Sequence, residues 1–181
     1  GNSVTNDSVI RGELVVDEGD PYSALLINKS INKLKARGIF GKVNHKLSEG
    51  SSEDLKVLEI EVEEKATGEI IAGAGLGTDG GSVTFAVSEN NWLGRGVNLV
   101  SKLDLTQETI SGKLAIRNPN YNYTGNTIFT SVNISTADRT ASSGFESSQT
   151  GFSFGSEFEQ WRGIYFAPSI KAEFEKIEVQ S

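Results

Sequence analysis

Residues 68–88 read GEIIAGAGLGTDGGSVTFAVS, and this stretch decides the fold. Apolar side chains alternate with small or polar ones on both sides of a Gly-rich break at 78–81. A period of two residues is typical of strands, and such a break between two alternating runs indicates a hairpin. We therefore predict two antiparallel strands here, over 69–76 and 82–88.

The same alternation continues almost to the C-terminus. It predicts five more strands, joined by short breaks rich in Gly, Asn and Asp, over 97–105, 109–117, 127–136, 147–156 and 163–174. One face of the seven strands is apolar and consists of Ile70, Ala72, Ala74, Leu76, Val83, Phe85, Val87, Leu99, Leu103, Leu105, Ile110, Leu114, Ile116, Ile128, Val132, Ile134, Phe152, Phe154, Ile164, Phe166 and Ile170. The opposite face carries Asn98, Lys102, Asp104, Lys113, Arg117, Asn133, Lys171 and Glu173.

Such a meander fits two kinds of fold. An apolar outer face and a polar inner face are typical of an antiparallel up-and-down barrel that spans a membrane. The strands of a soluble β-sandwich alternate in the same way, so the period alone leaves both folds open.

Residues 1–67 have a different pattern, which predicts two helices. Thr5 is the expected N-cap of a short helix that ends near Leu14. Asp20 followed by Pro21 predicts the start of a second helix, which Gly38 ends. The second helix has an apolar stripe at three- and four-residue spacing, formed by Ala24, Ile27, Ile31 and Leu34.

Two further strands are predicted after these helices, over Lys42–Leu47 and Leu55–Glu63. Two strands under two helices make a marginal sheet, so we expect a third strand before Thr5 and a chain that is cut from a longer protein. The lack of any Met agrees with that expectation. A net charge of −7 argues against nucleic acid as a partner, and the lack of Cys excludes disulfides and thiolate metal sites.

No residue pattern points to catalysis, a cofactor or a metal. Gly75-x-Gly77-x-x-Gly80 has the letters of the dinucleotide fingerprint, but that motif opens a helix and a strand pattern follows these residues. His45 is the single histidine, and the acidic segment at 17–20 lacks the spaced ligands of a calcium loop. We therefore predict that the protein is not an enzyme and needs no cofactor.

Several motifs within residues 2–100 occur in the order known from one family. They are Val9-Ile10-Arg11-x-Glu13-Leu14, Glu18-Gly19-Asp20, Arg37-Gly38-x-Phe40, Val62-Glu63-Glu64, Thr67-Gly68-Glu69 and Asn91-x-Leu93-Gly94-Arg95-Gly96. With these motifs, residues 1–67 resemble the last POTRA domain, and the residues that follow resemble the first barrel strands, of BamA-type outer-membrane assembly factors. Residues 101–181 share mainly the strand pattern.

The resemblance implies an α+β POTRA-like domain over 1–67, with its first strand missing, and an incomplete transmembrane β-barrel of about seven strands over 68–181. It implies a location in the outer membrane of a Gram-negative bacterium, with residues 1–67 in the periplasm. The breaks at 78–81, 106–108 and 137–145 would then be extracellular. Those at 90–96, 118–126 and 157–161 would be periplasmic, with an aromatic girdle of Trp92, Tyr121, Tyr123 and Trp161.

The resemblance also implies a function, which is to fold and insert β-barrel proteins into the outer membrane. The implied partners are nascent outer-membrane proteins, accessory outer-membrane lipoproteins and lipid. Function would then depend on unpaired strand edges, whose backbone groups can take up a strand of another chain.

We expect two such edges. The edge of the POTRA sheet consists of Lys42, Val43, Asn44, His45, Lys46 and Leu47. The edge of the first barrel strand consists of Glu69, Ile70, Ile71, Ala72, Gly73, Ala74, Gly75 and Leu76, and its glycines are expected to weaken pairing so that a seam can open. Open edges would also let this chain associate with a second copy.

Two other functions remain open. A related POTRA-barrel transporter, which secretes a partner protein through its lumen, has the same modules and differs in the number of POTRA domains. A soluble β-rich binding module would close its strands over a core and gather aromatic residues on one exposed face.

Overall fold

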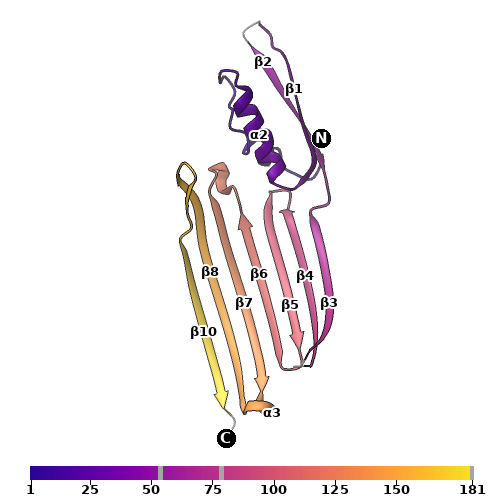
Figure 1. The fold of residues 1–181 in the computed structure, drawn as a ribbon, viewed down its shortest axis with the longest axis vertical. Coiled ribbons are helices and arrows are strands. Elements are labelled where there is room, and N and C mark those ends of the chain that lie inside the picture. Colours follow the sequence, from indigo (N-terminus) through magenta and orange to yellow (C-terminus); the bar gives the residue numbers. More distant parts are fainter. Residues whose placement is uncertain (53–54, 78–79, 180–181) are drawn as a thin grey trace.

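The computed structural model describes residues 1–52, 55–77 and 80–179, which form two parts that lie end to end (Figure 1). The N-terminal part contains α1 (Asp7–Arg11), α2 (Ala24–Ala36), β1 (Phe40–Glu49) and β2 (Lys56–Glu64). The two strands form a two-stranded sheet, and α2 packs against β1. Among the described residues, no helix has the length and apolar character needed to cross a membrane.

The helix starts differ from the predicted ones. The N-cap of α2 is Ser23, whose hydroxyl accepts a hydrogen bond from the N–H of Leu26 at 3.4 Å. The prediction of Asp20 is wrong, because this carboxylate accepts from the N–H of Asp17 at 2.8 Å and closes a turn before the helix. Gly38 follows the last turn with φ +70°, a conformation that suits glycine, so the predicted end of α2 is confirmed.

The first helix, α1, is shorter at both ends than the helix predicted from Thr5 to Leu14. It begins at Asp7, after Asn6 in the N-cap position, and ends at Arg11. Thr5 is buried and points to another part of the chain, so it is not available as a cap.

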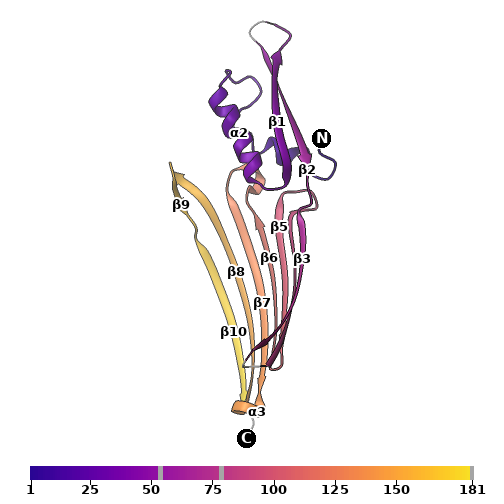
Figure 2. The ribbon, with the colours of Figure 1, turned by 45° about the vertical axis from the view of Figure 1, so that its right-hand side comes forward.

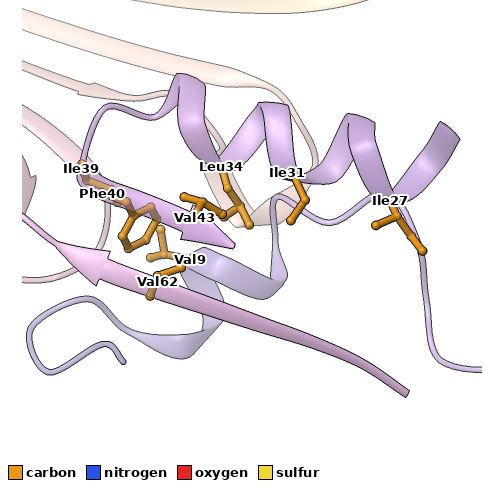
Figure 3. Close-up of a cluster of buried hydrophobic side chains, with 8 residues drawn as sticks. All are labelled: Val9, Ile27, Ile31, Leu34, Ile39, Phe40, Val43 and Val62. Atoms are coloured by element: carbon orange, nitrogen blue, oxygen red, sulfur yellow. The ribbon is translucent and has the colours of Figure 1, made fainter. Parts of the chain in front are cut away.

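The core of the N-terminal part consists of eight apolar side chains, each at most 7% exposed: Val9, Ile27, Ile31, Leu34, Ile39, Phe40, Val43 and Val62 (Figure 3). Figure 3 shows that α2 directs its side chains toward β1 and β2, with Val9 of α1 beside them. Ala24, which was predicted in the stripe of α2, is exposed. The other three predicted members of the stripe lie in the core.

The C-terminal part is one antiparallel sheet, in the order β3-β4-β5-β6-β7-β8-β10, with β9 paired to the end of β8. Its strands are β3 (Gly68–Gly77), β4 (Gly80–Trp92), β5 (Val97–Thr106), β6 (Thr109–Asn118), β7 (Thr127–Arg139), β8 (Phe145–Trp161), β9 (Ile164–Phe166) and β10 (Ser169–Val179). Two short helices, η1 (Tyr121–Tyr123) and α3 (Thr140–Ser143), lie in its turns. The sheet is bowed but not closed, and β3 and β10 form its two edges (Figure 2).

The predicted meander is confirmed, with four corrections at the ends of its strands. β4 continues to Trp92, into the break predicted at 90–96. β7 and β8 extend into the break predicted at 137–145, of which only α3 and Gly144 remain between them. The break predicted at 157–161 is also strand, since β8 continues to Trp161. The last predicted strand is divided into β9 and β10 at Ala167-Pro168, because proline has no N–H for a ladder.

The two faces of the sheet follow from its register. Residue pairing places Ala72, Phe85, Leu103, Gly112 and Ile134 in one row across five strands. A second row on this face consists of Val87, Ser101, Leu114, Val132 and Phe152. The opposite face has the row Lys102, Lys113, Asn133, Gly151 and Glu173. We call the first the apolar face and the second the polar face.

Candidate functional site

The first predicted edge, Lys42–Leu47, lies within β1. These residues pair with β2 in the register Lys42↔Glu63 to Leu47↔Leu58, and within the described residues no strand pairs with their other side. Val43 is buried in the core, while the remaining five side chains are exposed. The geometry therefore offers one row of backbone donors and acceptors beside α2.

An ion pair joins β1 to β2 on the exposed side of this strand pair. Lys42 Nζ lies 2.8 Å from Glu63 Oε2, and their hydrogen bond raises the pKa of the lysine and lowers that of the glutamate. His45 is exposed and pairs with Ile60 across the sheet. The described part of the chain has no cluster of His, Asp or Glu that could hold a metal.

The second predicted edge, Glu69–Leu76, lies within β3 at the border of the large sheet. In the part of the chain that the structure describes, β4 is the one strand paired with β3, and all ten residues of β3 are exposed. A Cβ atom added at Gly73 or Gly77 would meet nothing within 4 Å, so these glycines leave the strand thin. Gly75 and Gly77 belong to β3 and Gly80 begins β4, so no helix follows the glycines as a dinucleotide site requires.

The two edges belong to separate sheets and do not form a common surface. Between them lies a junction of the two parts, which the sequence did not reveal. It begins with the first residues of the chain. The Glu64 carboxylate, at the end of β2, accepts hydrogen bonds from the N–H groups of Ser3 (2.7 Å), Val4 (3.1 Å) and Thr5 (2.6 Å).

The end of β4 and the turn that follows it are the next component of the junction. Asn91 Nδ2 donates to Thr5 Oγ1, and Asn91 Oδ1 accepts from the N–H of Gly96, both at 2.8 Å. The N–H of Asn6 donates to the carbonyl of Gly94 at 2.8 Å. Gly94 has φ +69°, and a Cβ there would clash with the carbonyl oxygen of Val4, so only glycine fits.

Glu13 connects the N-terminal part to a second turn, between β6 and β7. Glu13 is 5% exposed, and its carboxylate accepts a hydrogen bond from Asn120 Nδ2 at 3.0 Å. Asn120 Nδ2 also donates to the carbonyl of Gly12 at 2.9 Å. The ring of Tyr123 in η1 lies directly against Gly12. Part of the predicted aromatic girdle is therefore in contact with α1.

Two cations complete this junction. Arg37 Nε lies 3.5 Å from Glu13 Oε1, and Lys33 Nζ lies 3.6 Å from Glu13 Oε2. Arg37 Nη2 donates to the carbonyl of Gly96 at 2.6 Å. Burial lowers the pKa of Arg37, and the charge of Glu13 opposes this shift. The buried ion pair thus lies where α1, α2 and both turns meet.

The sequence contained only an indirect sign of this junction. Glu13, Arg37, Asn91, Gly94 and Gly96 are members of the motifs on which the family resemblance was based. Asn120 belongs to none of them and lies 107 residues from Glu13. Residues this far apart give no local period, so only the folded chain reveals their contact.

Comparisons with known proteins agree with this arrangement. Residues 1–65 match the family model POTRA, described as a surface antigen variable number repeat. The chain is 33% identical over 104 residues to the outer membrane protein assembly factor BamA of Neorickettsia risticii. The aligned region covers 57% of this chain and 14% of that protein. The chain is also 29% identical over 127 residues to BamA of Neisseria meningitidis serogroup B. This aligned region covers 69% of this chain and 16% of that protein.

Two solved structures have the same fold. The crystal structure of BamA from Haemophilus ducreyi lacking POTRA domains 1–3 superposes with a TM-score of 0.79 at 22% identity, over 98% of this chain and 34% of that one. CdiB from Acinetobacter baumannii gives a TM-score of 0.61 at 10% identity, over 96% of this chain and 36% of that one.

The chain spans about a seventh of the length of the curated relatives named above. The predicted fold class, a POTRA-like domain followed by an open meander of barrel strands, agrees with both solved structures. The predicted outer-membrane location agrees with the names of the curated relatives. The resemblance of this chain to outer-membrane assembly factors of the BamA type, with a POTRA domain and barrel strands, is therefore confirmed.

Proposed function

We propose that this chain is the part of an outer-membrane assembly factor in which the periplasmic POTRA domain meets the first barrel strands. In this proposal residues 1–67 lie in the periplasm and residues 68–181 span the outer membrane. The factor folds and inserts other β-barrel proteins without a cofactor or hydrolysis. The names of the curated relatives support this assignment.

The observation that carries the proposed mechanism is the open edge of β3. This strand presents ten exposed residues at the border of the sheet. Gly73, Gly75 and Gly77 contribute no side chain to packing at this edge. Because an unpaired strand offers a full row of backbone donors and acceptors, a client strand can pair with it. In the intact barrel, the same edge would form a weak seam with the last strand.

The edge of β1 is the second proposed contact. It lies in the periplasm and is accessible beside α2, so it suits a strand of a nascent client or of an accessory lipoprotein. The junction holds this domain against two turns of the barrel. A client bound at β1 would therefore be kept close to the mouth of the barrel.

Proline substitution tests the role of the β3 edge. Ala74→Pro removes one backbone N–H from β3, whereas the control Ala141→Pro changes α3, at the opposite end of the sheet from the POTRA domain. The parent protein carrying either change would be placed in lipid vesicles, and insertion of a client barrel would be followed by its heat-dependent gel mobility. We expect Ala74→Pro to reduce insertion more strongly, and equal effects would contradict the proposed seam.

A transporter that secretes a partner protein has the same modules and remains the alternative. The same vesicles can distinguish the two functions. Transfer of a soluble partner across the bilayer, with no insertion of client barrels, would favour the transporter.

A further inference from the structure

The open edge of β1 carries positive charge, and its paired neighbour β2 carries negative charge. Lys42, Asn44 and Lys46 flank the buried Val43 at alternate positions, so they lie on the face of this sheet that turns away from the core. The residues opposite these three on β2 are all carboxylates, in the order Glu63, Glu61 and Glu59. The sign of the charge therefore changes from one strand to the next.

The lysines of this edge are only partly paired. Lys42 Nζ contacts Glu63 Oε2 at 2.8 Å. Lys46 stands opposite Glu59 in the register, yet the ion pairs found among the described residues do not include it. Residues 40–48 contain no carboxylate. A strand added to this edge would therefore meet cations first.

The helix α2 adds a third cation beside the edge. Lys33 pairs with Glu13, which marks the side of α2 that faces α1 and the segment after it. At about 100° per residue, the opposite side of the helix consists of Ala24, Asn28 and Lys35. Since α2 packs against β1, this side borders the open edge (Figure 3). Lys35 is exposed there.

A strand that pairs with β1 would meet different surroundings on its two faces. On the core side it would meet α2 and Leu47, which is 38% exposed. On the other side it would meet Lys42 and Lys46, which are four residues apart. A barrel strand has a matching division into an apolar and a polar face. β10 is an example, with Ile170, Ala172 and Phe174 on its apolar face and Glu173 and Glu175 on its polar face.

We propose that the β1 edge selects client strands that have one apolar face and carboxylates four residues apart on the polar face. This inference rests on the proposed function, in which a client strand pairs with β1, and it adds the chemistry that such a strand needs. Opposite charges directly across a strand pair are stabilising and like charges are destabilising. The same two lysines would therefore reject basic strands.

Distance decides between the lysines of β1 and the glutamates of β2. An added strand would lie about 4.8 Å from β1 and about twice as far from β2. The longer distance exceeds the Debye length of about 8 Å in physiological salt, so the glutamates are largely screened. Lys42 and Lys46 therefore dominate the charge that the added strand meets.

Three nine-residue peptides test this selectivity. The acidic peptide, TVEVTVEVT, has valines on one face and two glutamates four residues apart on the other, and it reads the same in both directions. The other two peptides have glutamine or lysine in place of glutamate. Binding of each fluorescent peptide to the parent protein, in micelles of an uncharged detergent, would be followed by anisotropy. We expect the glutamine peptide to bind about 2- to 30-fold more weakly than the acidic one, and the lysine peptide more weakly still.

Charge variants of the protein assign this preference to the edge. Lys42→Gln combined with Lys46→Gln should remove the difference between the acidic and the glutamine peptide. The matched control combines Lys29→Gln with Lys56→Gln, which removes the same charge from exposed positions on α2 and β2. The control should keep the difference.

Disulfide trapping locates the bound peptide independently of its charge. Asn44→Cys lies between the two lysines, and each peptide would carry a cysteine in place of its central threonine, with cysteines elsewhere in the protein changed to serine. Equal trapping and equal affinity of all three peptides would refute the selectivity while strand pairing at β1 stands. A preference for the acidic peptide that persists without Lys42 and Lys46 would also overturn the inference. If no peptide is trapped at 44, the proposed strand pairing at β1 is itself wrong.

Discussion

The apolar side chains of the POTRA core are buried, whereas those of the sheet are partly or fully exposed. In the domain, eight apolar residues from α1, α2, β1, β2 and the segment before β1 pack into a core and are at most 7% exposed. In the sheet, Phe85 and Phe152 remain 49% and 48% exposed, and no described apolar side chain from 68 to 179 reaches the burial of the core. One chain thus contains a core closed by protein and a face with no protein cover.

This difference indicates which solvent each part needs. A contiguous apolar face of this size is unusual on a protein surrounded by water, and it marks a surface that is covered by something else. Within 1–52, 55–77 and 80–179 no second sheet packs on this face, so the fold described is not a sandwich. In the proposed orientation, lipid covers the apolar face and the polar face lines the lumen.

The largest effect is expected when the core is opened. Leu34 is fully buried, so Leu34→Ala should lower the free energy of unfolding of the POTRA domain by about 2–5 kcal/mol. Leu25→Ala on the same helix is the matched control, because Leu25 is exposed and its loss should change stability by less than about 0.5 kcal/mol. Urea unfolding followed by circular dichroism measures both, and similar losses would argue against the assigned core.

A charge on the apolar face should have the next largest effect. Phe152→Lys would place an ammonium group in lipid at a cost of about 2–4 kcal/mol near the membrane midplane. Ser153→Lys, one residue away, would point to the lumen and should cost much less. Folding yield into vesicles over a urea series compares the two variants. The opposite order of effects would reverse the assigned faces.

Glu13→Gln should loosen the junction without opening the core. This change leaves Arg37 partly buried without its carboxylate, which we expect to cost about 1–3 kcal/mol. The distribution of distances between spin labels on α2 and on β6 should become broader. Glu18→Gln is the control, since Glu18 is exposed and pairs with Arg11, which is also exposed. Unchanged distances in Glu13→Gln would show that the ion pair does not set the orientation.

The smallest effect is a pH dependence at Glu64. The hydroxyl of Thr5 and the backbone N–H groups of Ser3, Thr5 and Val4 hold the pKa of this carboxyl far below its ordinary value. A lowered pKa in the folded state contributes stability above the unfolded value of about 4.3, and this contribution is lost as the pH falls further.

The native chain should therefore lose more stability between about pH 6 and pH 3 than the Glu64→Gln variant does. Urea midpoints at the two pH values measure the difference, and subtraction of the variant removes the effect of other carboxyls. The same loss in both proteins would show that Glu64 does not hold the first residues.

The alternation of apolar and polar side chains was sufficient to predict the order and faces of the barrel strands, because every second side chain lies on the same face. The alternation could not predict the residues at which the strands begin and end. β7 and β8 continue through polar segments, since backbone pairing with a neighbour does not depend on side-chain polarity. Likewise Asp20 and Ser23 are both good capping residues, and only the path of the chain decides between them.

The residues of both predicted edges lie in strands, and their role in binding stays a prediction, whereas the junction was not predicted. Its contacts between the two parts join residues that are 59 to 108 positions apart, such as Arg37 with Gly96 and Gly12 with Asn120. No local period encodes such pairs. Gly94 and Gly96 appeared in a family motif, but the contacts that favour glycine are visible only in the fold. A Cβ at 94 would meet the carbonyl oxygen of Val4, and a Cβ at 96 would meet the side chain of Arg37.

The central claim is that lipid, and not protein, covers the apolar face of the sheet. Light scattering coupled to size exclusion of the 181-residue chain, with and without detergent, tests it most directly. We expect a single species with bound detergent, and association through the apolar face and open edges when detergent is removed. A compact monomer in buffer alone would mean that the strands close over a core of their own, and would contradict the account.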